Sequence, residues 1–245
     1  FTDWRGKVHS VDDLKAAAMR ETAELSSSSP GIPQADRFGG WAGGPKLKAT
    51  GFFRTEKVGG KWWIVDPDGR LFFSHGVGHY AMRQPTGISK REEYFESLPP
   101  DKGEARPFYA TLTEPAFMGF YGKLENLPCR TFDFYGWNLF RKYGEDWRTR
   151  DREMAHRRAR AWGLNTLSSG QSEDARSGAS RIPYTVTIST KARPIAGAKG
   201  YWGSLTDFFS PEFEARVRKA VGEKRAAGTN EYCLGWFSDN EQSWG

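Results

Sequence analysis

The sequence has little cysteine, no long hydrophobic run and no large excess of one sign of charge. Its two cysteines, Cys129 and Cys233, exclude a disulfide framework, although one bridge stays open because spacing does not report Cα separation. No apolar run approaches the roughly 18 residues of a membrane-spanning helix, and residues 1–7 lack the regions of a signal peptide. These absences predict a soluble globular chain with no membrane partner, whether or not a signal preceded residue 1.

The charges are mixed along the chain. The 36 basic and 30 acidic residues give a formal net charge of +6, which would suit nucleic acid or a sulfated polysaccharide if it were clustered. The densest basic stretch, residues 148–160, also contains Asp151 and Glu153 and is typical of a helix with a solvated face. Nucleic-acid-binding domains usually gather their basic residues. We therefore expect no nucleic-acid partner; that hypothesis would require an affinity that collapses with added salt.

Aromatic residues and glycine are plentiful, with 10 Trp, 9 Tyr and 17 Phe beside 28 Gly. Aromatic faces stack on the apolar faces of sugar rings, but large cores also consume aromatic side chains. The composition therefore points only weakly to a carbohydrate cleft. For Trp62, Trp63 and Trp162 we expect core packing.

The first 50 residues predict a helical extension followed by a linker. Ser10 and Asp13 can cap a helix over residues 11–25, and the serines and glycines that follow are typical of an irregular connection. From Gly51 the pattern changes to two strands joined by a tight turn, and then to a buried strand. We therefore expect domains at residues 1–50 and 51–245. The three strands are expected at residues 52–58, 61–65 and 71–77.

After these strands comes a stretch without a clear period, residues 84–130. It predicts a long decorated loop with a short helix at residues 92–98. Beyond it, helices and strands alternate, and Ser210 followed by Pro211 marks a helix start. Helices are expected at residues 135–143, at 147–162 and from 211 onward, and strands at residues 164–167, 182–190 and 231–238.

Four strands separated by helix-bearing segments predict the α/β class, with a parallel sheet and right-handed crossovers. A (β/α)8 TIM barrel needs about 250 residues for the barrel alone. Because the first 50 residues lie elsewhere, residues 51–245 predict the first half of such a barrel, strands 1 to 4.

The last predicted strand delivers Ser238, Asp239, Asn240 and Glu241 to the carboxyl end of the sheet, where barrel enzymes place their catalytic groups. A carboxyl group there can protonate a glycosidic oxygen. Taken alone, a polar loop at a strand end is the simpler interpretation.

Three segments favour a catalytic role over an ordinary polar loop. Residues 234–245, LGWFSDNEQSWG, resemble the fourth barrel strand of clan A glycoside hydrolases, which ends in Asn-Glu with the Glu as acid/base. Residues 51–77 and 203–213 resemble β-agarases of glycoside hydrolase family 50. The resemblance covers about residues 51–245, the N-terminal part only. Asp-Asn-Glu also occurs in β-galactosidases of the same clan, so that activity remains an alternative.

The resemblance implies a retaining hydrolase of β-linked galactan, such as agarose or its oligosaccharides, acting by double displacement. Glu241 would be the acid/base, Asn240 would bind the hydroxyl beside the anomeric carbon, and Asp239 would support them. The nucleophile, a Glu on the seventh strand, would lie beyond Gly245. We therefore expect this stretch to be inactive without the C-terminal half of the same barrel. A catalytically inactive carbohydrate-binding barrel is the other alternative, and the resemblance implies a secreted or periplasmic protein.

Four more residues are candidates for substrate binding: His75, His79, Gln171 and Trp202. The histidines follow the first parallel strand and Gln171 the second, at the predicted active-site end. Trp202 follows the third strand in a glycine-flanked loop, where it would be a stacking platform. Ordinary strand-end or loop polarity is the alternative for the two histidines and Gln171.

No motif predicts a cofactor or a metal. The spacing of His75 and His79 would suit zinc only on a helix, and no third ligand is nearby. Residues 76–81 match a dinucleotide-binding fingerprint, but Pro85 intervenes and no capped helix follows. We therefore expect neither zinc nor a dinucleotide.

Overall fold

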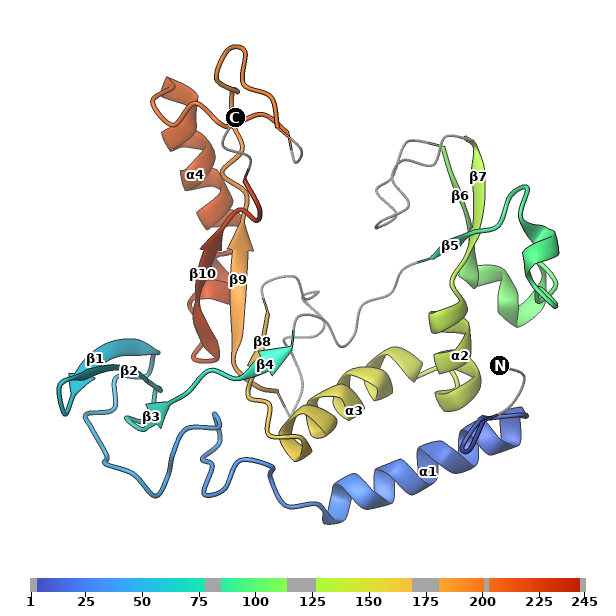
Figure 1. Ribbon diagram of the computed structural model, residues 1–245, viewed down its shortest axis with the longest axis horizontal. Helices are drawn as coiled ribbons and strands as arrows, with labels where there is room; N and C mark the ends of the chain where they lie inside the picture. Colours follow the sequence, from blue (N-terminus) through green and yellow to red (C-terminus); the bar gives the residue numbers. More distant parts are fainter. Residues whose placement is uncertain (1–3, 78–84, 114–126, 169–180, 201–202, 243–245) are drawn as a thin grey trace. The chain divides into compact units, whose positions relative to one another are not determined.

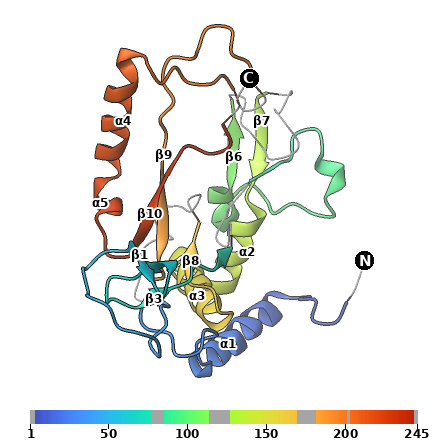
Figure 2. The same cartoon turned by 60° about the vertical axis from the view of Figure 1, so that its left-hand side comes forward.

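The computed structural model describes residues 4–77, 85–113, 127–168, 181–200 and 203–242, and Figures 1 and 2 show the chain from two sides. The packing of the backbone divides the chain into two compact units, which we describe separately. The first consists of residues 1–27 and 81–154, and the second of residues 28–80 and 155–245. Within the described ranges, no helix is long and apolar enough to cross a membrane.

The first unit begins with the helix predicted from Ser10 and Asp13. The Ser10 hydroxyl accepts a hydrogen bond from Asp13 N at 3.0 Å, and the Asp13 carboxylate accepts one from His9 N at 3.3 Å. This reciprocal arrangement is related to a capping box and starts the helix where the sequence predicts it. An ion pair of 3.2 Å between Glu21 and Lys142 joins this helix to the helix over residues 134–143 of the same unit. The helices are α1 (Val11–Ser27), α2 (Phe134–Tyr143) and the 3-10 helices η1 (Glu92–Tyr94) and η2 (Gly103–Phe108).

The prediction of a long loop over residues 84–130 is wrong, because this segment forms most of an antiparallel sheet. Phe132, at the end of the sheet's central strand, pairs with Thr86 on one side and Tyr109 on the other. These partners are more than 20 residues away in the chain, so no local periodicity reports the pairing. The buried rings of Phe108, Phe132 and Trp147 form the core of this unit. The sheet has the order β5 (Thr86–Gly87), β7 (Cys129–Phe132), β6 (Tyr109–Leu112).

The second unit contains an antiparallel and a parallel sheet. The antiparallel sheet has the predicted hairpin, with Arg54 opposite Val65 and Val58 opposite Lys61. The strand expected at residues 71–77 is two short strands, the first paired with the hairpin and the second in the parallel sheet. The antiparallel order is β1 (Arg54–Val58), β2 (Lys61–Val65), β3 (Leu71–Phe72), and the parallel order is β10 (Cys233–Ser238), β9 (Tyr184–Ile188), β8 (Thr166–Leu167), β4 (Gly76–Val77).

All strand pairs of the four-stranded sheet are parallel, and spatial neighbours follow one another in the chain order of this sheet's own strands. The α/β class and the parallel sheet are therefore as predicted. Phe38, Leu167, Val186 and Tyr232 are buried in the core at this sheet. Three helices accompany these strands: α3 (Trp147–Ala161), which begins in the first unit, α4 (Pro211–Glu223) and α5 (Arg225–Gly228).

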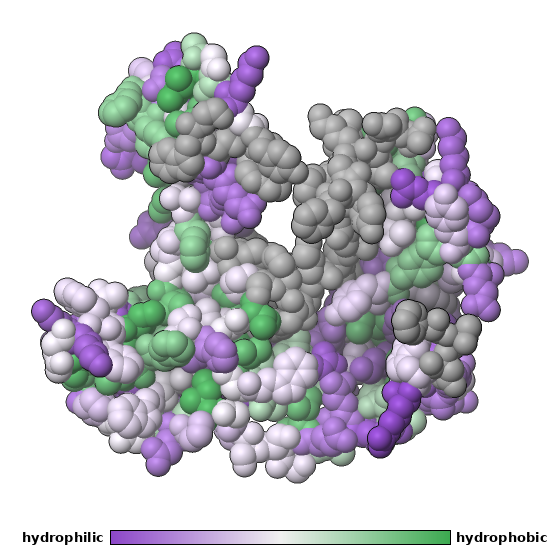
Figure 3. Space-filling view, in the orientation of Figure 1, coloured by the Kyte–Doolittle hydropathy of each residue, from purple (hydrophilic) through white to green (hydrophobic). Residues whose placement is uncertain are grey.

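Two details differ from the sequence-based expectations. Ser210 precedes α4 as predicted, but its hydroxyl makes no cap hydrogen bond. Trp62 is 72% exposed and Trp162 67% exposed, so their assignment to the core is wrong. Figure 3 shows hydrophobic and polar side chains intermixed on the surface of the β1–β3 part.

Cys129 and Cys233 are both buried free thiols, so they form no bridge with each other.

Candidate active site

The polar segment after β10 lies beyond the carboxyl end of the parallel sheet, as expected from the sequence. The side chains of Asn240 and Glu241 are exposed, whereas Asp239 is buried. Together they line a cavity of about 770 Å³. The walls of this cavity also include residues from the end of β9 and from the loop and helix α4 that follow it, namely Ile188, Thr190, Phe208, Phe213 and Val217.

Asp239 ties the ends of β9 and β10 together. Its backbone N–H donates to Ile188 O at 2.8 Å. Its carboxylate accepts a hydrogen bond from Thr190 N at 2.9 Å and another from the Thr190 hydroxyl. Gln242 Nε2 donates to the same carboxylate at 3.0 Å. The Asp239 carboxylate therefore accepts hydrogen bonds that hold the turn, whereas the neighbouring Asn240 and Glu241 are exposed to solvent.

The turn itself has an uncommon backbone conformation. Asp239 has φ of 57° and Glu241 has φ of 49°, in the left-handed region that non-glycine residues seldom adopt. This backbone conformation costs roughly 1–3 kcal/mol for each non-glycine residue and persists only where surrounding contacts hold it. Residues with such conformations are concentrated at functional sites. The Asp239 hydrogen bonds are contacts of this kind. Glu241 is thereby presented to the cavity by a turn that the adjoining strand fixes.

His75 lies elsewhere. It precedes β4, and its carbonyl accepts a hydrogen bond from Asn165 N just before β8. The prediction that it follows the first parallel strand at the end of the sheet that carries Glu241 is therefore wrong. The physical reason is that the apolar run at residues 71–77 is divided between two sheets, which moves His75 to the amino end of β4. It lines a separate, smaller cavity.

The other predicted substrate contacts, His79, Gln171 and Trp202, lie outside the described residues. Conversely, Thr190 and Gln242 are partners of Asp239 that were not expected from the sequence. The position of Thr190 at the end of the predicted strand 182–190 was a usable signal, because the ends of neighbouring parallel strands meet at one edge of the sheet. Gln242 carried no such signal. Within the described ranges, no group of three or more His, Cys, Asp or Glu is arranged to hold a metal ion.

The chain was compared with known proteins in both sequence and structure. The chain matches no protein-family profile. It is 32% identical over 271 aligned positions to β-agarase B from Vibrio sp. (strain JT0107), an alignment that covers 100% of this chain and 27% of that relative. The solved structure of PfGH50B superimposes with a TM-score of 0.83 at 30% identity, covering 100% of this chain and 37% of the other. The crystal structure of the agarase AgWH50C gives 0.82 at 27% identity, covering 99% and 36%.

The chain is similar to β-agarases along its entire length. The resemblance inferred from residues 51–77, 203–213 and 234–245 is thereby confirmed, and it extends to the first 50 residues as well. The chain spans about a quarter of the length of the β-agarase from Vibrio and somewhat more than a third of the solved structures.

Proposed function

We propose that the chain is part of a retaining glycoside hydrolase that cleaves β-linked galactan of the agarose type, with Glu241 as the acid/base. The observation that carries the proposal is the position of Glu241: exposed in a cavity, on a braced turn, at the carboxyl end of a parallel sheet. The similarity to β-agarases supports the choice of substrate.

In the proposed reaction, the Glu241 carboxyl protonates the glycosidic oxygen of the leaving sugar while a second carboxylate attacks the anomeric carbon. The resulting glycosyl-enzyme is hydrolysed by a water molecule that the Glu241 carboxylate deprotonates. The two carboxyl groups need a separation of about 5–5.5 Å for this route. We assign the nucleophile to polypeptide beyond residue 245.

The neighbours of Glu241 take distinct parts in the proposal. Asn240, exposed beside Glu241, donates to the sugar hydroxyl next to the anomeric carbon, a contact that strengthens as positive charge develops on the ring. Asp239 is a positioning residue, since its carboxylate is engaged by Thr190 and Gln242. His79, Gln171 and Trp202 are proposed as further contacts to the sugar chain.

We further propose that the four-stranded sheet is the first half of a TIM barrel within a catalytic domain of residues 51–245, with residues 1–50 as an extension. The strand order, in which each strand of this sheet neighbours the next parallel strand of the chain, is what a barrel requires. Within the described ranges β10 and β4 each lack a second neighbour, and open edges of this kind invite further pairing. The remaining strands of the same barrel would supply those neighbours, and the chain alone would be inactive.

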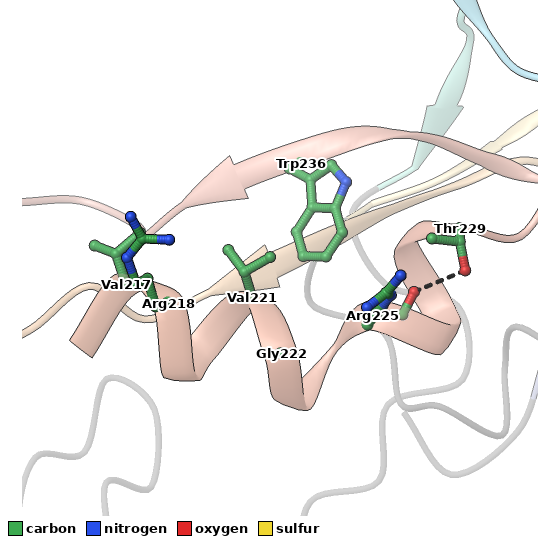
Figure 4. A pocket seen from close by; sticks show the side chains of 7 residues that line it. All are labelled: Val217, Arg218, Val221, Gly222, Arg225, Thr229 and Trp236. Atoms are coloured by element: carbon green, nitrogen blue, oxygen red, sulfur yellow. Dashed lines mark hydrogen bonds between the residues drawn. The ribbon is translucent and has the colours of Figure 1, made fainter. Parts of the chain in front are cut away.

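A groove beside β10 is consistent with further polypeptide in this region. Trp236 projects from β10 toward Val221 of α4, and these side chains line a pocket of about 570 Å³ (Figure 4). The ring packs closely on Gly228, where an added Cβ would lie 1.6 Å from a ring atom. Trp236 is nevertheless 40% exposed and Val221 is equally so. Exposed apolar side chains gathered in one groove are typical of a surface that another segment covers.

A β-galactosidase-like activity and a catalytically inactive carbohydrate-binding barrel remain the alternatives. Both share the Asn240–Glu241 site; a galactosidase would accept small aryl galactosides better than agarose-type chains, and a binding protein would turn over neither. We also propose that the protein works outside the cytoplasm, secreted or periplasmic, because a polysaccharide of this kind does not cross the cell membrane.

The test is Glu241→Gln in the full-length protein. We expect a loss of about 10²–10⁴-fold in turnover of agaro-oligosaccharides, whose leaving group needs protonation. With an aryl glycoside, whose leaving group needs no protonation, the rate of glycosyl-enzyme formation should fall far less. Added azide should restore turnover, because it can replace water as the nucleophile that attacks the glycosyl-enzyme. The matched control is Glu223→Gln on α4, an exposed carboxylate outside the cavity. Near-normal turnover in Glu241→Gln would remove this residue from the mechanism.

A further inference from the structure

A second cavity, of about 210 Å³, lies at the opposite end of the parallel sheet from Glu241. Its lining includes His75 and Asn165, which precede β4 and β8, whereas Glu241 follows the carboxyl end of β10. Three aromatic side chains, Trp41, Trp63 and Phe73, form much of its wall. The cavity shares no lining residue with the one at Glu241. It is therefore a separate site.

Two of these aromatic rings, Trp41 and Phe73, are exposed to solvent, and contacts with the backbone fix the orientation of Trp41. Trp41 is 49% exposed and Phe73 is 76% exposed, unusual values for large rings in a folded unit. The Trp41 backbone N–H donates to Leu71 O at 2.8 Å. Its indole ring packs on Gly44, where an added Cβ would lie 2.3 Å from ring atom Cε3. A glycine at that position lets the ring lie flat against the backbone, and this fixes its orientation.

Asn165 fixes the rest of the wall. Its side-chain oxygen accepts a hydrogen bond from His75 N at 2.8 Å, and its Nδ2 donates to Phe73 O at 3.0 Å and to Gly39 O at 3.2 Å. One buried amide thus joins the segments that carry Phe73 and His75 to the loop at Gly39. The close approach requires a glycine at position 39, where φ is 89° and an added Cβ would lie 2.6 Å from Asn165 Cβ. The cavity is therefore pre-organised.

Two polar atoms at the cavity are available to a ligand. His75 Nδ1 lies 3.1 Å from Gly163 O, and because a carbonyl can only accept, Nδ1 carries the proton. In the neutral ring this leaves Nε2 as a hydrogen-bond acceptor, and Nε2 has no partner in the described part of the chain. The Trp41 indole N–H is likewise without a partner among the described residues. The cavity thus offers one acceptor and one donor beside its aromatic rings.

None of the cavity's lining residues is Asp, Glu, Lys or Arg. A ligand with a formal charge would lose its hydration there without gaining a counter-charge. At about 210 Å³ the cavity is below the usual range of about 300–1,000 Å³ for drug-sized ligands, and it suits a single small ring. A neutral sugar combines an apolar face, which stacks on aromatic rings, with hydroxyl groups that both donate and accept.

We propose that this cavity is an auxiliary carbohydrate-binding site that holds one neutral sugar unit of a galactan chain, away from the catalytic centre. Trp41 and Phe73 stack on the sugar, and His75 Nε2 accepts a hydrogen bond from a hydroxyl. The choice of galactan rests on the proposed function. A second attachment point raises the effective concentration of a polymeric substrate near the enzyme, and it has no such benefit for a short one.

The experiment measures retardation of the full-length protein during electrophoresis in gels that contain neutral agarose, in a Glu241→Gln background so that the matrix stays intact. We expect Trp41→Ala and Phe73→Ala each to weaken the apparent affinity about three- to tenfold, the scale of a lost stacking contact. The matched control is Trp62→Ala: Trp62 is an exposed tryptophan in the same unit that does not line the cavity, and its loss should leave retardation unchanged.

Equal retardation of Phe73→Ala and Trp62→Ala would overturn the proposal. Phe73→Ala decides the matter if Trp41→Ala fails to fold, because a ring that is 76% exposed contributes little to stability. If another part of the full-length protein covers the cavity, Phe73→Ala will lower the unfolding temperature without changing retardation, and this also overturns the proposal. Turnover by Glu241→Gln is a separate readout, so failure of the proposed function would be recognised independently.

Discussion

Asp36 and Asp66 bring their carboxyl groups together in the interior of the second unit. Asp36 Oδ1 accepts hydrogen bonds from the backbone of Phe38 and Gly40, at 2.9 and 2.8 Å. Asp66 Oδ1 accepts from the backbone of Asp68 and Arg70, at 3.0 and 2.8 Å. The Oδ2 atoms of both are buried and have no donor among the described residues. A shared proton, carried by the Asp66 carboxyl and donated to the Asp36 carboxylate, would satisfy both side chains.

This pair makes stability depend on pH. Burial, and next the hydrogen bond and charge of Asp36, raise the pKa of Asp66 to about 7. The ordinary pKa of an Asp side chain is 3.8, so folding favours the protonated form. The stabilisation is complete below about pH 4 and is lost as the pH rises through 7. We expect the free energy of unfolding contributed by this pair to decrease between pH 4 and 7.

Asp66→Asn should remove this dependence. An amide keeps the Oδ1 acceptor and permanently donates to Asp36 Oδ2, so the variant should be more stable than the parent at pH 8. The gain is at most about 4 kcal/mol, from a shift of about three pKa units at about 1.4 kcal/mol per unit. Urea unfolding at pH 5 and 8 measures the difference. Asp146→Asn, at an exposed position, is the control. The charges around the pair, on Arg37, Asp68, Arg70 and Glu231, are the same in parent and variant. A parent-to-variant difference that does not change with pH contradicts the shared proton.

Thr190→Val should impair catalysis although Thr190 does not touch the reacting atoms in our proposal. The substitution keeps the shape but removes the hydroxyl that donates to the Asp239 carboxylate, which holds the turn before Glu241. We expect kcat on agaro-oligosaccharides to fall about tenfold with a smaller change in KM. Thr190→Ser retains the hydroxyl and should restore most of the rate. If Val and Ser variants have the same kcat, the hydroxyl does not position the turn.

Asn165→Ala should destabilise the second unit strongly. It removes a buried side chain whose amide joins Gly39, Phe73 and His75, and it leaves their backbone groups without partners. A buried group that loses its hydrogen bond costs about 1–3 kcal/mol, so we expect a total of about 3 kcal/mol by urea unfolding. Asn138→Ala on the exposed face of α2 should cost less than about 0.5 kcal/mol. If Asn165→Ala lowered the free energy of unfolding as little as Asn138→Ala, water would have to replace the hydrogen bonds of Asn165.

The 245 residues on their own should have no glycosidase activity, because the proposed nucleophile and the neighbours of β10 and β4 come from other polypeptide. We expect the isolated chain to bind the hydrophobic dye ANS through its exposed apolar groove, and the full-length protein to bind much less. Both can be measured side by side, with turnover of agaro-oligosaccharides as the second readout. Activity of the isolated chain at the full-length rate would contradict the proposed mechanism.

Short-range patterns predicted part of this structure well. The Ser10–Asp13 cap, the hairpin from Arg54 to Val65 and the final strand before Asp239 all depend on neighbours within a few residues, and all occur near their predicted positions. The antiparallel sheet around Phe132 could not be predicted in this way, because its strands are short and its partners are distant in the chain. The same applies to the division of residues 71–77 between two sheets, which moved His75 away from Glu241.

The sequence by itself determined the long helices, the hairpin from Arg54 to Val65, the order of the parallel strands, and the polar group Asp239, Asn240 and Glu241 at the end of the last one. Periodicity, caps and turns are local, and they act before distant residues meet. The tertiary structure alone decided that Thr190 holds Asp239, that Asp36 meets Asp66, and that Trp41, Phe73 and His75 share a cavity. These contacts join residues up to 49 positions apart or come from separate segments, and only the folded backbone brings them within reach.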